Sequence, residues 1–355
     1  MNFFIIGGGV AGLSTAYVLL RQGHGVTLAD AKRPGQSSWA GAGILCPLPP
    51  WKYDEPTNRL ALGGMRAWPE WAAETARLSG HDPEYWACGM EFDAAAAGEH
   101  ALEWCCAHDF PASRSERGGI WLPSVGQLRN PRLIAALTGA VTVLGGKILS
   151  DCEITGVRQA GGKVLAALAG KLEYMADVFV WAGGAWVGQR LGQMAPVPNV
   201  RPVRGQMLLY APGSHALEHI LYRDGLYLVP RRDGHLLAGS TVEDVGFDAD
   251  TTPETLQSLH EAACRLLPEL RTRRPIRSWA GLRPGSPDNI PTVDRHADYE
   301  NVWVNTGHFR YGVTMAPASS RLLAELMLGE SPHIDPEPYS WQSGFGRHWQ
   351  GASAC

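Results

Sequence analysis

Three glycines with the spacing G-x-G-x-x-G stand near the start of the chain, in Gly7-Gly8-Gly9-Val10-Ala11-Gly12. In such a segment the first glycine permits a tight turn, the second lets the backbone approach a pyrophosphate, and the third lets a helix pack closely on a strand. The N-terminus of that helix faces the phosphate charge. Asp30 stands 18 residues after Gly12, where a carboxylate can accept hydrogen bonds from ribose hydroxyls. The segment predicts a dinucleotide-binding site, the alternative being a glycine-rich structural turn.

A second glycine-rich segment, Trp181-Ala182-Gly183-Gly184-Ala185-Trp186, follows a strand-like run at Val178–Val180. Two glycine turns at the ends of strands, far apart in the sequence, suit a long cofactor that several segments contact. We therefore expect Ala182 and Gly183 to contact the cofactor. The alternative for this second turn is close packing of a helix on its strand.

The elements that must position the first turn follow a βαβ order. Phe3–Ile6 is a short apolar run typical of a strand that is buried on both faces. Helical spacing extends from Val10 to Leu20, and Val26–Asp30 has the pattern of a second strand. A strand, a helix and a strand in this order indicate an α/β fold with a parallel sheet.

Further along the chain, helical and strand-like patterns continue. Helical patterns lie at 58–79, 99–108, 131–140, Pro253–Leu267 and Val313–Leu328. Strand-like runs lie at 147–157, 163–169, Val178–Trp181, Met207–Tyr210, Leu226–Val229, His235–Gly239, Ile276–Leu282 and Asn301–Asn305. Asp233-Gly234 predicts a hairpin turn between two of them, and Gly329 predicts the end of the last helix. The tail from Ser331 shows little pattern, and we expect irregular packing there.

Length and composition limit the class of protein. At about 150 residues per domain, 355 residues suggest two domains, or three at most. An apolar fraction of 45% with 19% charged residues excludes a disordered chain. The net charge of −4 argues against a large nucleic-acid interface. Residues 1–20 carry no charged side chain, but glycines interrupt them, so we expect neither a membrane span nor a signal peptide.

The seven cysteines are odd in number and form no C-x-x-C pair. This pattern favours neither a disulfide framework nor a zinc site, so we expect no metal and a reducing, cytoplasmic location.

Several longer segments together resemble the D-amino-acid oxidase family of flavoproteins, and within it the glycine oxidases of thiamin biosynthesis. The resemblance covers nearly all of residues 1–330. Besides the Gly7–Gly12 turn with Asp30, it rests on segments 37–45 (SSWAGAGIL), 202–206 (PVRGQ), 221–231 (LYRDGLYLVPR), 279–285 (WAGLRPG) and 307–312 (GHFRYG).

The resemblance implies noncovalent FAD, and no cysteine lies near Pro291–Asp294, where some relatives attach flavin covalently. It places Asp30 at the adenosine ribose, Ile154 at the adenine, and residues His308 to Thr314 beneath the flavin ring. The full expected set is Gly7, Gly9, Val10, Ala11, Gly12, Asp30, Ala31, Ser37, Ser38, Ala42, Gly43, Ile44, Ile154, Ala182, Gly183, His308, Phe309, Arg310, Tyr311, Gly312, Val313 and Thr314. The helix near Val313 would direct its positive end at the flavin.

For an amino-acid substrate the handle is the carboxylate, whose best partner is a planar guanidinium. Alternation in the strand at 276–282 puts Gly281 and Arg283 on one face, so that Gly281 leaves a gap beside Arg283, and Pro284 keeps Arg283 extended. The resemblance assigns the carboxylate to Arg283, adds the Tyr227 hydroxyl, and makes Arg310 a second active-site arginine. For Arg283 the alternative is a surface arginine, for Tyr227 an ordinary strand tyrosine, and for Arg310 a structural ion pair.

The implied reaction is FAD-dependent oxidative deamination of glycine, sarcosine or a small D-amino acid. A hydride passes to flavin N5, the imine hydrolyses to a keto acid, and O2 reoxidises the flavin to give H2O2. Flavin N5 carries the chemistry, so we expect no catalytic residue: no strong acid or base on the protein is required. The alternatives are a dehydrogenase that passes electrons to a quinone or another carrier, and a nucleotide-binding partner protein without turnover.

Two departures from the family leave the preferred substrate open. Gly225 stands where some glycine oxidases have histidine, and the loop at 47–53 is rich in proline and aromatic residues. The oligomeric state, including a homo-oligomer, also stays open.

The expected architecture is a Rossmann-like FAD-binding domain interleaved with an antiparallel-sheet α+β substrate domain. We expect the FAD-binding domain at 1–80, 127–197 and 277–332, the substrate domain at 81–126 and 198–276, and a C-terminal tail at 333–355.

Overall fold

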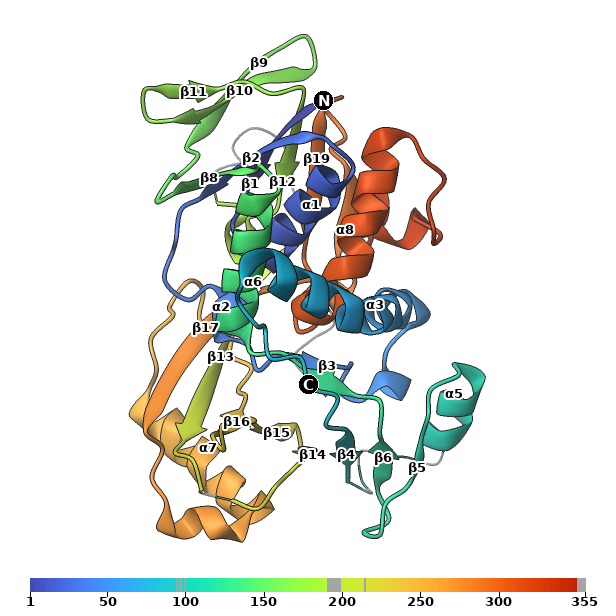
Figure 1. The fold of residues 1–355 in the computed structure, drawn as a ribbon, viewed down its shortest axis with the longest axis vertical. Coiled ribbons are helices and arrows are strands. Elements are labelled where there is room, and N and C mark those ends of the chain that lie inside the picture. Colours follow the sequence, from blue (N-terminus) through green and yellow to red (C-terminus); the bar gives the residue numbers. More distant parts are fainter. Residues whose placement is uncertain (94, 96–97, 99, 190–198, 214, 350–355) are drawn as a thin grey trace.

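A computed structural model describes the whole chain except residues 94, 96–97, 99, 190–198, 214 and 350–355. Two large sheets organise the molecule. A six-stranded sheet lies in the upper half of Figure 1 and an eight-stranded sheet in the lower half. The chain passes between them several times, so each sheet is assembled from distant parts of the sequence.

The six-stranded sheet is almost entirely parallel. Its order is β18 (Thr292–Arg295), β19 (Val302–Thr306), β12 (Val178–Trp181), β1 (Asn2–Ile6), β2 (Gly25–Asp30) and β8 (Lys147–Ser150). Only the edge pair β18–β19 is antiparallel. This order confirms the predicted βαβ start, with β1 near the centre of the sheet.

Both faces of this sheet are covered. On one face Phe3 and Ile5 pack within the core formed with helices α1 (Val10–Arg21), α3 (Glu55–Ser79), α6 (Asn130–Val143) and α8 (Gly312–Leu328). On the other face Phe4 packs with Val164 and Ala167 of a small sheet, β9 (Gly156–Ala160), β10 (Lys163–Ala169) and β11 (Leu172–Tyr174). Burial on both sides explains the continuous apolar run at Phe3–Ile6.

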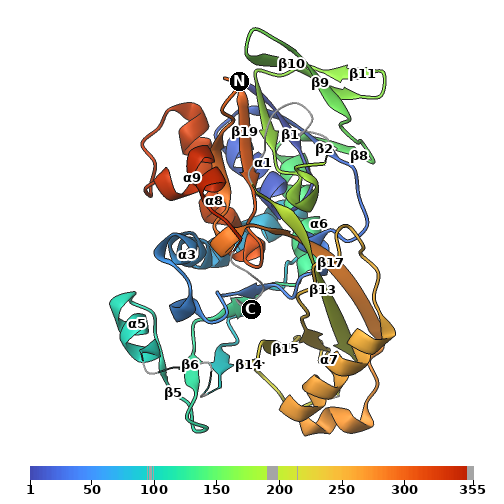
Figure 2. The same ribbon diagram turned by 180° about the vertical axis from the view of Figure 1, so that it is seen from behind.

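The eight-stranded sheet is mostly antiparallel. Its order is β17 (Arg277–Gly285), β13 (Arg201–Tyr210), β16 (Leu236–Gly239), β15 (Leu226–Pro230), β14 (Ile220–Arg223), β4 (Met90–Phe92), β6 (Ile120–Leu122) and β5 (Ser113–Arg114). The hairpin β15–β16 turns at Asp233-Gly234 as predicted. Helix α7 (Pro253–Leu266) packs on this sheet through Leu259 and Ala263. The view from behind shows the helix lying against the sheet (Figure 2).

The remaining elements are short. They are α2 (Ser37–Ala40), β3 (Ile44–Leu45), which pairs with β7 (Gly126–Gln127), α5 (Ala101–Ala107), α9 (Trp341–Gly346), and the 3-10 turns Pro50–Lys52, Gly184–Trp186, Pro268–Thr272, Pro287–Asn289 and Glu337–Tyr339.

The sequence prediction was wrong at several elements. The run at 147–157 divides into β8 and β9, because the chain turns at Asp151, where φ is 56°. Strand β13 begins at Arg201, well before Met207, since its polar first half pairs with β17. The tail is not wholly irregular: α9 begins at Trp341, whose ring lies 4.2 Å from that of His296. Strands β4, β6, β14 and β18 were not predicted.

One expected domain boundary also needs correction. Strand β17 begins at residue 277, where the FAD-binding domain was expected to resume, but it pairs with β13 in the eight-stranded sheet. The segment 277–285 therefore belongs with that sheet. The other boundaries stay a prediction.

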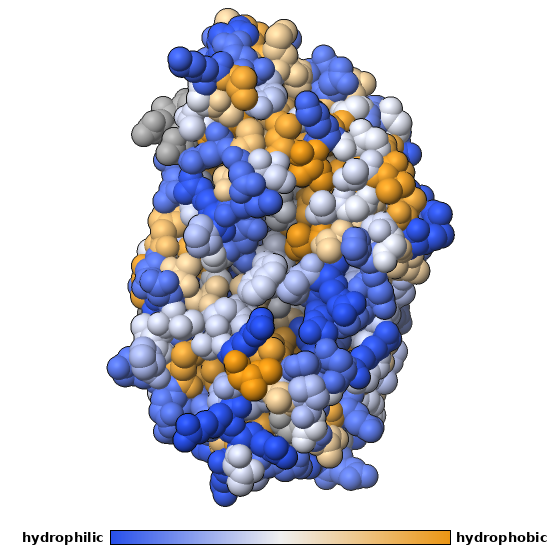
Figure 3. All heavy atoms as spheres, turned by 60° about the vertical axis from the view of Figure 1, so that its left-hand side comes forward, coloured by the Kyte–Doolittle hydropathy of each residue, from blue (hydrophilic) through white to orange (hydrophobic). Residues whose placement is uncertain are grey.

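On the face drawn in Figure 3, hydrophobic side chains form small groups separated by hydrophilic ones. Within the described part of the chain, the helices are all too short or too polar to cross a bilayer.

Candidate active site

One long pocket joins the carboxyl end of the six-stranded sheet to the eight-stranded sheet. It extends from Asp30 and Ile154 at one end, past the glycine turn, to Tyr227 and Arg283 at the other. The predicted residues that line it are Gly7, Gly9, Val10, Ala11, Asp30, Ala31, Ser37, Ser38, Ala42, Gly43, Ile44, Ile154, Ala182, Gly183, Tyr227, Arg283, His308, Phe309, Arg310, Tyr311, Gly312 and Val313. Segments more than 300 residues apart thus share one cavity.

Gly12 and Thr314 do not line the pocket but lie directly behind it. A Cβ at Gly12 would collide with the backbone oxygen of Gly7, so Gly12 is required for the close approach of α1 to the turn. The Thr314 hydroxyl donates a hydrogen bond to the Ile44 backbone oxygen at 3.1 Å. Both residues therefore shape the pocket wall without facing its space.

The glycine turn has the geometry that a bound pyrophosphate requires. Gly7 has φ of 119°, and a Cβ there would collide with the carbonyl of Ala182 in the second glycine segment. Gly8 is equally constrained, because its Cβ would lie 2.6 Å from the Asp30 side chain. Helix α1 begins after Gly9 without a side-chain cap, and the Val10 amide donates to the Ser38 hydroxyl at 3.0 Å. The helix N-terminus thus faces the pocket as a site for an anion.

Asp30 ends β2 with its carboxylate held in place. Its Oδ1 accepts hydrogen bonds from the Lys32 amide and from Gln36 Nε2, each at 3.1 Å. Arg33 is paired with Glu153 at 2.6 Å. Gln36 and Glu153 also line the pocket and were missed by the sequence analysis, because their contacts to this site need the folded chain.

The loop that contains Ala42 and Gly43 is fastened from behind by an arginine that the sequence analysis did not single out. Arg231 Nη2 donates to the Ala42 carbonyl at 2.8 Å, and Nη1 donates to Leu128 O at 3.0 Å and to Gln127 Oε1 at 2.6 Å. Burial lowers the pKa of Arg231 to about 10. A buried guanidinium bound by neutral oxygens fixes the path of this loop.

The segment from His308 to Val313 forms the wall beside that loop. His308 is buried, and its Nε2 lies 3.1 Å from the Ser319 hydroxyl. Burial lowers the pKa of His308 to about 4, so the imidazole is neutral at physiological pH. Helix α8 begins at Gly312 without a side-chain cap, and Gly312 and Val313 line the pocket. Its positive end therefore faces the same space.

At the far end of the pocket two guanidinium groups lie near each other. Arg283 donates from Nη1 to the Thr241 carbonyl at 3.1 Å and from Nη2 to the Ser240 hydroxyl at 2.6 Å. Arg310 lies near four phenol rings, Tyr53, Tyr222, Tyr227 and Tyr311. Within the described residues neither arginine forms an ion pair with a carboxylate. Two cations without an anion between them form a receptor for an anionic ligand.

The gap beside Arg283 comes from a different glycine than expected. At Gly281 the space is filled by Ala40 of α2. The guanidinium of Arg283 lies instead over Gly205 of β13, where any Cβ would collide with it. Pro284 continues β17 to Gly285, so Arg283 is extended as predicted. Tyr53 and Tyr222, two of the rings near Arg310, were not predicted as site residues.

These features fit FAD. The pocket provides a carboxylate for a ribose, a capless helix N-terminus for the diphosphate, and a broad wall at 42–44 and 308–313 for a ring. Asn130 and Asn305 line the pocket, and the buried Oδ1 of each has no hydrogen-bond partner among the described residues. Within the described part of the chain, His, Cys, Asp and Glu nowhere gather into a group that could hold a metal ion.

The sequence matches the family model described as FAD dependent oxidoreductase over residues 2–326. It is 36% identical over 353 residues to a glycine oxidase of Pseudomonas aeruginosa, covering 95% of this chain and 97% of that protein. It is 31% identical over 348 residues to the bifunctional protein ThiO/ThiG of Trichormus variabilis, covering 92% of this chain and 52% of that longer protein. The crystal structure of glycine oxidase from Geobacillus kaustophilus superposes with a TM-score of 0.88 at 24% identity, covering 96% of this chain and 97% of that one.

Proposed function

The chain belongs to the family of FAD-dependent oxidoreductases, and from that premise we propose that it oxidises a small amino acid such as glycine, sarcosine or a small D-amino acid. That it is an FAD-dependent enzyme acting on amino acids or amines follows from its relatives. The observation that carries the finer proposal is the pair Arg283 and Arg310, two cations at the end of the pocket without an acidic partner among the described residues.

In the proposed complex Arg283 binds the substrate carboxylate through its planar guanidinium. The Tyr227 hydroxyl, which now donates to Met207 Sδ at 3.4 Å, turns to the same carboxylate. Arg310 adds positive potential from the other side, and burial within this site lowers the pKa of Arg283. Leu48 and Met207 line the same end and keep the space small. Binding through the carboxylate would orient the α-carbon toward the wall where the flavin ring belongs.

Bound FAD supplies the redox chemistry by accepting a hydride from the substrate α-carbon. The chain's own part is to bind, orient and exclude water. His308 does not serve as a base, because burial lowers its pKa to about 4 and its Nε2 is already hydrogen-bonded to Ser319. The substrate must therefore arrive with its amine neutral, having lost the proton to solvent. The imine product then hydrolyses to the keto acid and a free amine, which is ammonia for glycine or a D-amino acid and methylamine for sarcosine.

We further propose that O2 takes the electrons and yields H2O2. Transfer to a quinone or another carrier is the alternative. The likeness to the bifunctional ThiO/ThiG protein suggests thiamin biosynthesis as the setting, with amino-acid catabolism as the alternative.

One experiment tests substrate and acceptor in turn. The purified holoprotein is mixed anaerobically with glycine, sarcosine and small D- and L-amino acids, and loss of the yellow flavin absorbance is followed. Bleaching by a small amino acid supports the proposal, and a flavin that none of them bleaches contradicts it. Admitting O2 then distinguishes the acceptors, because an oxidase recovers its colour at once with one H2O2 per flavin, whereas a dehydrogenase recovers rapidly only with an added quinone.

A further inference from the structure

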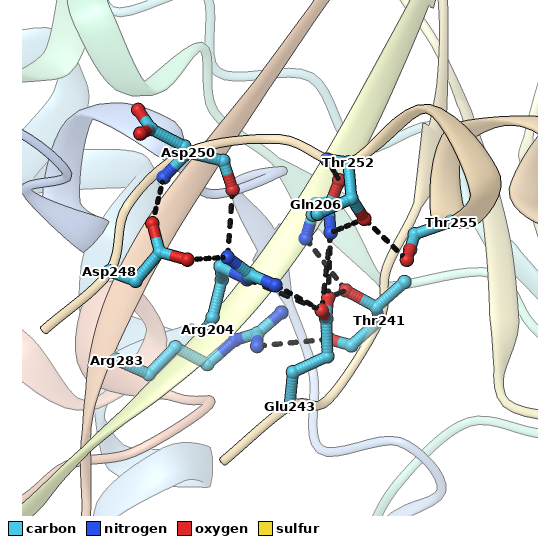
Figure 4. Close-up of polar contacts among 9 residues, drawn as sticks. All are labelled: Arg204, Gln206, Thr241, Glu243, Asp248, Asp250, Thr252, Thr255 and Arg283. Carbon is cyan, nitrogen blue, oxygen red and sulfur yellow. Dashed lines mark hydrogen bonds and ion pairs between the residues drawn. The ribbon is translucent and has the colours of Figure 1, made fainter. Parts of the chain in front are cut away.

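The side chains that hold Arg283 belong to a larger polar network behind the pocket (Figure 4). Arg283 donates to the carbonyl of Thr241 and to the hydroxyl of Ser240, so its position depends on the segment 240–241. This segment follows β16 and has no regular secondary structure of its own. Contacts with other elements must therefore hold the segment 240–241 in place.

Thr241 is fixed by its hydroxyl. Its Oγ1 accepts a hydrogen bond from the backbone N–H of Gln206 at 2.9 Å and donates to Glu243 Oε1. The backbones of Glu243 and Arg204 also exchange two hydrogen bonds, at 2.9 and 3.0 Å. Glu243 thus ties the segment that holds Arg283 to strand β13.

Glu243 is in turn held by two side chains of β13. Its Oε2 accepts hydrogen bonds from Arg204 Nη2 at 2.7 Å and Nε at 3.2 Å. Gln206 Nε2 donates to both of its oxygens, at 3.0 and 3.2 Å. Burial raises and these hydrogen bonds lower the pKa of Glu243, with a net lowering, so it stays ionised at neutral pH. Alternation along β13 places Arg204 and Gln206 on one side, and leaves Gly205 on the other, beneath Arg283.

Arg204 has a second carboxylate partner that does not belong to this chain of contacts. Its Nη1 donates to Asp248 Oδ2 at 2.6 Å and to the Asp250 carbonyl at 3.0 Å. Asp248 is half exposed, with 49% of its side chain accessible, against 21% for Glu243. The Asp248 side chain contacts Arg204 and the backbone amide of Asp250, and not residues 240–241. Arg204 therefore binds two carboxylates that can be compared. Glu243 is connected to Arg283 through Thr241, and Asp248 is not.

We propose that Glu243 is a positioning residue for substrate binding: acting through Thr241, it holds the Arg283 guanidinium where a substrate carboxylate can meet it. The inference rests on the proposed function, in which Arg283 binds that carboxylate. Loss of Glu243 would free the 240–241 segment, and the guanidinium would lose its fixed orientation. Binding weakens in consequence, while the flavin and the chemical step stay as they are.

The test compares Glu243→Ala with Asp248→Asn in the holoprotein. The probe is acetate, a carboxylate that cannot be oxidised as an amine, and its Kd is read from the change in flavin absorbance. We expect Glu243→Ala to raise the acetate Kd and the amino-acid KM about ten- to hundredfold, with kcat and FAD content little changed. Asp248→Asn should leave both constants near wild type. An unchanged Kd in Glu243→Ala, or an equal rise in Asp248→Asn, would overturn the proposal.

Two further variants keep the test decisive if Glu243→Ala does not fold. Thr241→Val removes only the linking hydroxyl and leaves the Arg204–Glu243 pair intact, so it should raise Kd in the same direction. Thr241→Ser restores a hydroxyl and should recover most of the affinity. Equal Kd values for valine and serine at 241 contradict the proposal.

Arg283→Ala, measured in parallel, separates the two levels of inference. If it leaves the acetate Kd unchanged, the proposed role of Arg283 itself is wrong. If it raises Kd while Glu243→Ala and Thr241→Val do not, only the positioning role fails.

Discussion

The guanidinium of Arg283 lies in the space that a side chain at residue 205 would fill, so that Gly205 on β13 and Arg283 on β17 fit together across neighbouring strands. In the register of the two strands Val203 is the partner of Arg283, and Gly205 is two residues further along the same face. Any other residue at 205 would compete with the arginine for this space. The site thus requires a glycine at residue 205 as well as the arginine at residue 283.

Gly205→Ala should therefore weaken substrate binding without unfolding the protein. The methyl group would collide with the end of a flexible side chain, which can move, and not with backbone. Arg283 would leave Ser240 and Thr241, and we expect KM to rise about tenfold or more with kcat less affected. Steady-state kinetics with the preferred amino acid measures this. Gly346→Ala is the control, because a Cβ there meets nothing within 4 Å. Equal KM values in the two variants would show that Gly205 does not matter for the site.

Gly205 and Arg283 also show which parts of the site can be predicted from the sequence and which cannot. The turn at Gly7–Gly12 and Asp30 could be predicted because strand, turn and helix are local and each has its own pattern. Arg283 could be predicted from a resemblance and from strand alternation. Gly205 could not, because its role follows from the pairing of β13 with β17, and no local pattern specifies which strands pair or in what register. Alternation along β17 favours Gly281 instead, but Ala40 fills its space.

Long-range polar contacts were missed for the same reason. Arg231 holds the Ala42 carbonyl across 189 residues, and Arg204 meets Glu243 across 39. The sequence shows only a basic residue near a hairpin turn in the first case and a charged residue in a strand in the second. The four-residue strands β14 and β18 were missed because each ends in an arginine, whereas the equally short β12 and β16, which were predicted, contain no charged residue.

Asp30→Ala should weaken FAD retention. The carboxylate lies at the pocket end where a ribose would bind, and losing hydrogen bonds to a charged acceptor costs about 1.5–3 kcal/mol, or roughly ten- to hundredfold in affinity. The Kd of FAD for the apoprotein, measured by quenching of flavin fluorescence, tests this. Asp151→Asn is the control, because Asp151 is exposed and its ion pair within the described part of the chain is with Lys32, at 3.5 Å. Equal FAD affinities in the two variants would place the ribose elsewhere.

The buried His308 should make the protein less stable in mild acid. Burial lowers the pKa of His308 to about 4 in the folded chain, against ~6.5 when unfolded. Between these values the unfolded chain binds a proton that the folded chain does not, so the free energy of unfolding falls as the pH falls through this window. The loss approaches about 3 kcal/mol at the lower end, and above the window this group contributes no pH dependence.

Denaturant titrations at several pH values test this effect. His308→Gln should lose most of this pH dependence between about pH 6.5 and pH 4, whereas His100→Gln should not, since 84% of the His100 side chain is exposed. An unchanged slope in His308→Gln contradicts a neutral, buried imidazole. Because His308 is neutral across the physiological range, the pH profile of kcat/KM should show no ionisation of this group near neutrality.

Arg283→Ala should lower kcat/KM for amino acids by roughly two to three and a half orders of magnitude, because breaking a desolvated ion pair costs about 3–5 kcal/mol. FAD content should hardly change, since Arg283 contacts Ser240 and Thr241 at the substrate end of the pocket. Amines without a carboxylate should be poor substrates and nearly indifferent to the change. Arg283→Lys should recover little, because an ammonium cannot make the planar, two-point contact. Arg310→Ala is the comparison: Arg310 lies near four tyrosines and, in the proposed complex, supports the carboxylate from the side, so its loss should reduce kcat/KM less. If Arg310→Ala instead abolishes the preference for carboxylates while Arg283→Ala keeps it, the carboxylate is bound by Arg310.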